Sequence, residues 1–198
     1  SNLISWKPSP ISIEINKDAV MWAADGMDDN SVAFAARLME MNIETRIVDK
    51  EISLSGYDLS RGSVVVIGMD NPKTINLHEI VKNIASDLEI SITSLDSGFG
   101  PEELPDWGGR HFRLLEKPQI AILSHEGFNS YDVGVSWWSL DHHLGIRHSM
   151  INASLASYGD LRRYNTIIIP SGRAIDDYTV DTLLDWVSQG GTLIAHNR

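Results

Sequence analysis

Short apolar runs alternate along the chain with longer segments in which apolar residues recur every three or four positions. Runs of the first kind are typical of buried strands, and segments of the second kind are typical of amphipathic helices. In chain order they predict strand, helix, strand, strand, helix, strand, and the same order returns about 102 residues later. The corresponding strands are 20–23 and 120–123, 46–48 and 148–151, 64–67 and 167–169, and 90–92 and 193–195.

Two elements of the first half illustrate the pattern. The run 64–67 consists of four consecutive β-branched residues, which suit a strand covered on both faces. Segment 77–88 has apolar residues at helical spacing, so that one side of a helix would be apolar. Strands alternating with helices in this way predict an α/β fold, with mostly parallel sheets, helices on both faces and two similar β-α-β-β-α-β halves.

The composition changes between residues 97 and 118. This segment is rich in glycine and proline, with acidic residues between them, which is typical of a linker. It predicts two subdomains, 1–115 and 116–198. Because Ser1 and Asn2 look like the remnant of a cleaved tag and the chain stops just after an apolar strand, we expect a piece of a longer protein, truncated at its C-terminal end.

The overall composition excludes several classes of function. The 198 residues include no cysteine, which rules out a disulfide framework, a thiolate zinc site and a cysteine nucleophile within this chain. A net charge of −11 repels phosphate backbones, so nucleic acid is not an expected partner. No uncharged apolar stretch approaches the roughly 20 residues that cross a bilayer, so no membrane span is predicted.

Four segments of the second half resemble the class I glutamine amidotransferase-like fold, in the branch that lacks amidotransferase activity. Together with the run at 61–67, their order is similar to the C-terminal region of large bacterial zinc carboxypeptidase-like proteins, over roughly residues 50 to 198. The resemblance implies a flavodoxin-like second half, a periplasmic or secreted location, and zinc chemistry elsewhere in the parent protein. The segments are PQIAIL at 118–123, NSYD at 129–132, YNTIIIPSG at 164–172 and LDWVSQGGTLIA at 184–195.

The residues expected to carry catalysis in these families are missing from the chain. In active amidotransferases the nucleophilic cysteine follows the strand that 192–195 matches, and His196 occupies this place here. Without a thiolate the chain has no acyl-enzyme route from glutamine. A zinc carboxypeptidase would need two histidines and a glutamate, and no His-x-x-Glu pair with a later histidine is evident. The catalytic domain is therefore expected outside this chain.

Candidate site residues come from the rule that ligands gather at the carboxyl ends of parallel strands. His125 and Glu126 follow one predicted strand, Ser171 follows another, and His196 follows a third. A peptide or a carbohydrate could lie along this edge. The alternative is a small serine hydrolase acting through Ser171 and His196, with Glu126 as the carboxylate, although the Gly-x-Ser-x-Gly elbow is absent.

Other polar clusters are assigned to ordinary structural roles. Asp141, His142 and His143 are interpreted as a solvated helix end, because neighbouring helix positions point about 100° apart. The aspartates at 25–29 lack the spacing of a calcium loop, and the glycines after the first strands lack the dinucleotide motif. The Trp137–Trp138 pair is assigned to core and subdomain contacts. No metal or cofactor is predicted.

Together these observations favour a non-catalytic accessory or binding domain of a larger bacterial zinc carboxypeptidase-like protein. Its partners would be the rest of the parent polypeptide and a peptide or carbohydrate ligand. A homo-oligomerisation domain is a third hypothesis.

Overall fold

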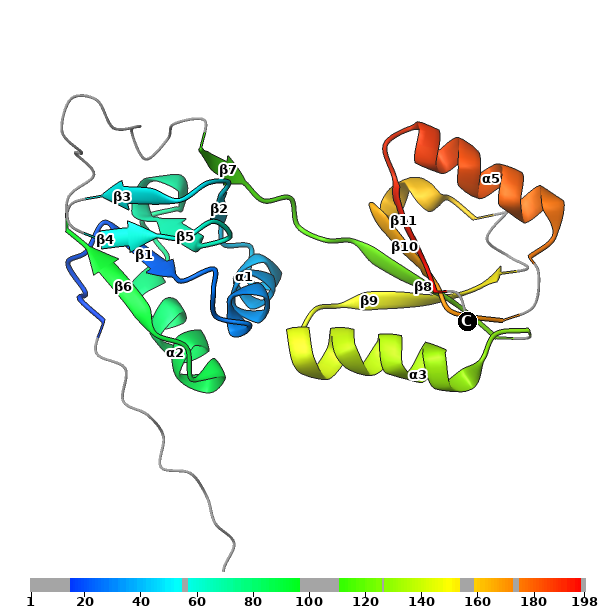
Figure 1. Cartoon of the computed structure of the whole chain (residues 1–198), viewed down its shortest axis with the longest axis horizontal. Helices are drawn as coiled ribbons and strands as arrows, with labels where there is room; N and C mark the ends of the chain where they lie inside the picture. Colours follow the sequence, from blue (N-terminus) through cyan, green and yellow to red (C-terminus); the bar gives the residue numbers. More distant parts are fainter. Residues whose placement is uncertain are drawn as a thin grey trace, which may run out of the picture. The chain divides into compact units, whose positions relative to one another are not determined.

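The computed structural model forms two compact units, unit 1 (Ser1–Leu115) and unit 2 (Glu116–Arg198) (Figure 1). It is an α/β structure in which strands and helices alternate. The residues that the structure describes are 15–54, 57–96, 111–125, 127–153, 159–172 and 175–196.

Unit 1 is built on a five-stranded sheet in which every neighbouring pair is antiparallel, in the order β6-β1-β5-β2-β7. A separate hairpin, β3–β4, lies between β2 and β5 in the chain. The elements are β1 (Met21–Ala24), α1 (Asn30–Glu40), β2 (Arg46–Val48), β3 (Ile52–Leu54), β4 (Tyr57–Leu59), β5 (Val64–Ile67), the 3₁₀ turn η1 (Gly68–Asp70), α2 (Leu77–Leu88), β6 (Ile92–Leu95) and β7 (Phe112–Leu114).

The prediction of a mostly parallel sheet is wrong for unit 1. Strands β1 and β2, joined through α1, do run in the same direction, but β5 lies between them and pairs with both in the opposite direction. In the same way β1 lies between β5 and β6. Counting β1, β2, β5 and β6 as strands one to four gives the order 4-1-3-2, the split β-α-β arrangement of ferredoxin-like folds.

The two faces of the unit 1 sheet are covered differently. Alternate strand residues, such as Trp22 and Val66, pack with α1 and α2 in one buried cluster. Their neighbours, such as Met21 and Val65, pack with residues of the β3–β4 hairpin in a second cluster. Both helices therefore lie on the same face, contrary to the expectation of helices on both faces. All four residues of β5 are buried, as their β-branched composition predicts.

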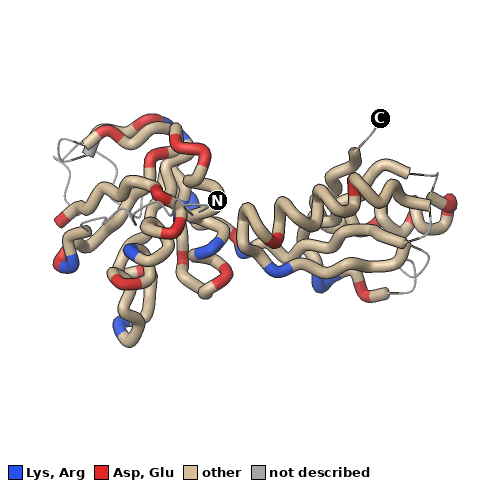
Figure 2. The backbone as a smooth tube through the Cα atoms, turned by 90° about the horizontal axis from the view of Figure 1, so that it is seen from below, with Lys and Arg blue, Asp and Glu red and all other residues tan. Residues whose placement is uncertain are grey.

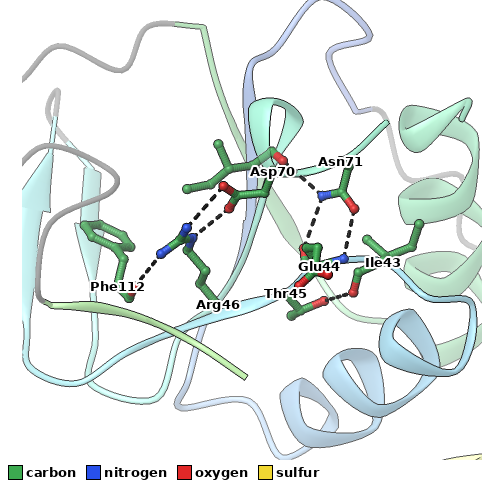
Figure 3. A network of polar contacts seen from close by, with 8 residues as sticks. Ile43, Glu44, Thr45, Arg46, Asp70, Asn71 and Phe112 are labelled. Atoms are coloured by element: carbon green, nitrogen blue, oxygen red, sulfur yellow. Dashed lines mark hydrogen bonds and ion pairs between the residues drawn. The ribbon is translucent and has the colours of Figure 1, made fainter. Parts of the chain in front are cut away.

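A buried asparagine ties the end of β5 to the beginning of β2 (Figure 3). The Nδ2 atom of Asn71 donates to the Ile67 carbonyl at 3.0 Å and to the Glu44 carbonyl at 3.2 Å. Its Oδ1 atom accepts from the Glu44 amide at 2.9 Å. Three backbone groups that have no partner in the sheet ladder are satisfied by this one side chain.

An arginine makes a second tie beside it. Arg46 on β2 donates to both carboxylate oxygens of Asp70, at 2.6 and 3.1 Å, and to the Phe112 carbonyl at 2.9 Å (Figure 3). The hydrogen bonds to Asp70 raise the pKa of the Arg46 guanidinium above its ordinary value. The planar, two-pronged geometry fixes η1 against β2 and β7.

Unit 2 contains a four-stranded parallel sheet, which confirms the predicted parallel arrangement for this half. Its order is β11-β10-β8-β9. The chain therefore passes from β8 to β9 on one side of β8, and then crosses to β10 and β11 on the other side. The elements are β8 (Ile120–Ser124), α3 (Ser130–Trp138), the π-helical turn η2 (Ser139–Leu144), β9 (His148–Asn152), the 3₁₀ turn η3 (Leu161–Arg163), β10 (Thr166–Ile169), α5 (Asp177–Ser188) and β11 (Thr192–Ala195).

Helices α3 and α5 cover opposite faces of this sheet (Figure 1). Leu183 and Trp186 of α5 pack on Ala121, Leu123 and Ile167, which share one face because side chains alternate along a strand. The other face meets α3. The strand order reverses between β8 and β10, which is the position where doubly wound sheets bind ligands.

Acidic positions are spread over both units, with lysine and arginine among them (Figure 2). Among the described residues, no helix has both the length and the apolar character that a membrane span requires.

Candidate functional site

The loops that follow β8 and β10 meet at the carboxyl edge of the unit 2 sheet. Phe128 and Gly172 form an isolated antiparallel bridge between the two loops. Beside it, the Asn129 amide donates to the Ser171 carbonyl at 2.8 Å. The crossover order therefore brings segments about 40 residues apart into direct contact at the point where strand order reverses.

Gly172 is required for this contact. A Cβ atom at this position would lie 2.5 Å from the Gly127 carbonyl oxygen and 2.8 Å from the Phe128 Cα. Both contacts are with backbone, so they cannot be relieved by moving a flexible side chain. The Ser-Gly pair after β10 thus has a specific structural reason, which is the close approach of the two loops.

Ser171 is held by an acidic residue of α3. Its hydroxyl donates to the carboxylate of Asp132 in the first turn of that helix. The same turn begins with Asn129, whose side chain accepts from the Tyr131 amide at 2.9 Å and caps the helix. The loop after β10 is therefore fastened to the beginning of α3.

Ser124 and His125 close the end of β8. Ser124 is 2% exposed, and its Oγ lies 2.8 Å from His125 Nδ1 and 3.3 Å from the Ile151 carbonyl oxygen. His125 is exposed and has a φ of 77°, in the left-handed region that residues with a side chain rarely adopt. Residues held in unfavourable backbone conformations cluster at binding and catalytic sites.

A groove of about 430 Å³ opens beside these two residues. Its described lining combines apolar side chains with a few polar groups and contains no lysine, arginine, aspartate or glutamate. Gly134 on α3 leaves space there, since a Cβ atom at this position would meet nothing within 4 Å. The lining residues are Ser124, His125, Phe128, Ser130, Val133, Gly134, Trp137 and Met150.

The structure brings some of the predicted site residues together. His125 and Ser171 lie on the two loops joined by the Phe128–Gly172 bridge. The amide of His196 donates to the Ile169 carbonyl at 2.9 Å, so His196 follows β11 beside the end of β10. Within the described part of the chain, no hydrogen bond joins the Ser171 hydroxyl to His196. Glu126 lies outside the described residues.

The two tryptophans of α3 are not core residues. Trp137 is 38% and Trp138 is 55% exposed, so their assignment to the core is wrong. His142 stacks on Trp138 and meets Trp137 edge-on, in both cases with ring centroids 5.7 Å apart. The apolar character of α3 is therefore spread around the helix instead of being directed only at the sheet.

The polar clusters that the sequence analysis assigned to structural roles have partners close by in the chain or in the same unit. Asp25 accepts hydrogen bonds from the Ser60 hydroxyl and the Met27 amide, which lower the pKa of its carboxyl. The Nε2 atom of His142 lies 3.8 Å from the Oδ2 atom of Asp141. Among the described residues, no group of three metal-binding side chains comes together.

Sequence reasoning missed most of the groove. It selected His125, but not Ser124, Gly134 or Met150, which depend on how α3 lies over β8 and β9. One signal was available in the sequence, which is the glycine at position 134 inside a predicted apolar helix. Glycine weakens a helix interior, so its presence there indicates a packing or binding role for the space that it leaves.

Comparisons of this chain with protein-family models, curated proteins and solved structures found no match.

Proposed function

We propose that the chain is a non-catalytic binding module whose ligand occupies the groove beside the carboxyl end of β8. The observation that carries this proposal is the position of the groove. It opens at the carboxyl end of β8, beside α3 and β9, and ligands of parallel sheets bind outside the carboxyl ends of their strands. Its volume falls within the range of about 300–1,000 Å³ typical of small-molecule sites.

The hydroxyl groups near the groove support binding rather than catalysis. The Ser171 hydroxyl donates a hydrogen bond to the Asp132 carboxylate and so fastens the β10 loop to α3. Ser124 is buried, and its hydroxyl contacts His125 and the Ile151 carbonyl oxygen of β9. Both hydroxyls therefore hold local structure, and neither serine stands in a Gly-x-Ser-x-Gly nucleophile elbow.

The wider role in this proposal comes from the sequence resemblance. Unit 2 would be the flavodoxin-like, amidotransferase-like part of an accessory domain in a larger bacterial zinc carboxypeptidase-like protein. The order 2-1-3-4 of its parallel strands supports this, because it matches the first four strands of flavodoxin-like sheets. The partners would be the rest of that polypeptide and a peptide or carbohydrate, in the periplasm or outside the cell.

The proposal is tested by a variant in which a larger side chain fills the groove, with ligand binding as the measurement. Gly134→Leu places an apolar side chain in open space on α3, so the fold should tolerate it while the groove is lost. Val135→Leu adds bulk to the same helix at a residue that is 61% exposed and outside the groove, and serves as the matched control. Ligand-observed NMR with N-acetyl amino acid amides and methyl glycosides should show binding to the wild type and the control only. Equal binding by the Gly134→Leu variant, or no binding by the wild type, would refute the site.

The serine hydrolase remains a second candidate because Ser171 and His196 both follow strands at the carboxyl edge of the sheet. Esterase and peptidase substrates separate it from the binding module. A module gives no turnover by the wild type or by Ser171→Ala. Turnover by the wild type that Ser171→Ala abolishes would establish the hydrolase.

A further inference from the structure

The backbone at His125 holds its side chain at the groove despite an unfavourable conformation. At a φ of 77° a glycine or asparagine would be accommodated more easily than a histidine. Among the described residues that line the groove, His125 is also the only ionisable one. An imidazole kept in a strained position beside an open groove points to a role in contacting what binds there.

The contacts of the neighbouring Ser124 favour a proton on Nδ1 of His125. A carbonyl oxygen only accepts, so the contact of 3.3 Å between Ser124 Oγ and the Ile151 oxygen has the hydroxyl as donor. With the single hydroxyl proton in this contact, the Ser124 oxygen accepts from His125 Nδ1 at 2.8 Å. A neutral imidazole carries a single proton, so Nε2 is left as an acceptor. Among the described residues Nε2 has no partner.

The rest of the groove defines the remainder of the ligand. Phe128, Val133, Trp137 and Met150 provide aromatic, aliphatic and thioether surfaces. Among the described residues that line the groove there is no carboxylate, lysine or arginine to compensate a charged ligand, and the net charge of −11 disfavours anions. An uncharged ligand with a flat apolar body suits these walls.

We infer that His125 is the specificity-determining residue of the groove, and that it accepts a hydrogen bond from an uncharged aromatic ligand carrying a donor, such as the phenol of a tyrosine side chain in a peptide. This inference rests on the proposed function, because it assigns a ligand class to the same groove. The apolar walls bind the ring, and Nε2 selects rings that carry a hydroxyl or an N–H group.

Two probes that differ only in the donor test it. N-acetyl-L-tyrosinamide carries the phenol, and its O-methyl ether has the same ring without the proton. Each is titrated into the ¹⁵N-labelled full chain at one fixed, mildly alkaline pH, with the Gly134 amide signal as the readout. The phenol is expected to bind about 3- to 10-fold more tightly than the ether, the usual effect of one neutral hydrogen bond.

His125→Gly removes the imidazole at a position where glycine has the more suitable backbone. The variant is expected to bind both probes with the affinity that the wild type has for the ether. The imidazole ¹⁵N shifts of the wild type provide an independent measurement, since they report directly whether Nδ1 or Nε2 is protonated.

The outcomes separate this inference from the proposed function. Equal affinity for the two probes, or a proton on Nε2, overturns the inference, while binding that Gly134→Leu abolishes still supports the groove as the site. Failure of both probes to bind at millimolar concentration refutes both. Tighter binding of methyl β-glucoside than of the phenol also overturns the inference, because it would assign the groove to a carbohydrate.

Discussion

Replacing Asn71 by aspartate tests the polar tie between β5 and β2 in unit 1. The change keeps the size of the side chain and the oxygen that accepts from the Glu44 amide. It removes the two hydrogen bonds that Nδ2 donates to the Glu44 and Ile67 carbonyls. A carboxylate oxygen is placed instead within about hydrogen-bonding distance of two carbonyl oxygens, which repel it.

The magnitude follows from these contacts. Two lost hydrogen bonds cost about 2 kcal/mol, and leaving buried polar groups without partners adds about 1–3 kcal/mol. Asn71 is only 6% exposed, so water relieves little of this cost. The free energy of unfolding of unit 1 should fall by about 3–5 kcal/mol at pH 7, a large part of the roughly 5–15 kcal/mol of a typical domain.

The loss should depend on pH in a definite direction. Burial and the two facing carbonyls raise the pKa of the introduced carboxyl in the folded state above its unfolded value of about 4. The folded state then binds the proton more tightly than the unfolded state. Relative to the wild type, the variant should become more stable as the pH falls from neutral toward the unfolded pKa.

Hydrogen exchange of the full chain, followed by mass spectrometry, measures the effect in unit 1 separately from unit 2. The peptides to follow are those that contain β2 and β5. Asn76→Asp is the matched control, because the Asn76 side chain only accepts, from the Glu79 amide at 3.5 Å, and caps α2. This control should leave stability unchanged or slightly raised. If the amides of β2 and β5 are equally well protected from exchange in the two variants at pH 7, the assigned role of Asn71 is wrong.

Three further changes have defined outcomes. Gly172→Ala should destabilise unit 2 by about 1–3 kcal/mol in urea unfolding, because its Cβ would press on backbone atoms of Gly127 and Phe128. Gly134→Ala should stabilise the same unit by about 0.5–1 kcal/mol, since it places alanine in a helix interior with open space around it. Asp176 accepts from the Thr179 amide and hydroxyl, which lowers its pKa, so its stabilising effect is present above about pH 4 and lost as the pH falls through the folded value. Asp176→Asn should therefore differ from the wild type near neutral pH and converge with it in acid, as measured by a pH series of thermal unfolding.

The sequence predicts the elements of both units better than it predicts their pairing. Apolar periodicity depends on which side of an element is buried, and this local property located β1, β5, β8 and β10. Whether two strands pair directly depends on the path of the chain between them. A segment of strand, helix and strand places its two strands in the same direction. Another strand can still lie between them, as β5 does between β1 and β2.

The candidate site divides in a similar way. Residues that follow a strand are local, so His125 and Ser171 could be selected from the sequence and do lie on adjoining loops. The partner of Ser171 could not be selected, because Asp132 is 39 residues away and its approach requires the crossover from β8 to β10. The groove depends on tertiary packing as well, through Gly134 and Met150.

The connection between the second and third strands explains why one element order forms two different sheets. In unit 1 this connection contains the β3–β4 hairpin, whose Ile52 and Leu59 cover the face opposite the helices. The chain therefore returns beside β2 and pairs with it in the antiparallel direction. In unit 2 the corresponding connection passes η3, where Leu161 packs with Trp186 of α5, and the chain crosses over to the far side of β8. Only this crossover brings two carboxyl strand ends together with a reversal of order between them. The groove also lies in unit 2, at the carboxyl end of β8 beside α3 and β9, although both units share the sequence pattern of strands and helices.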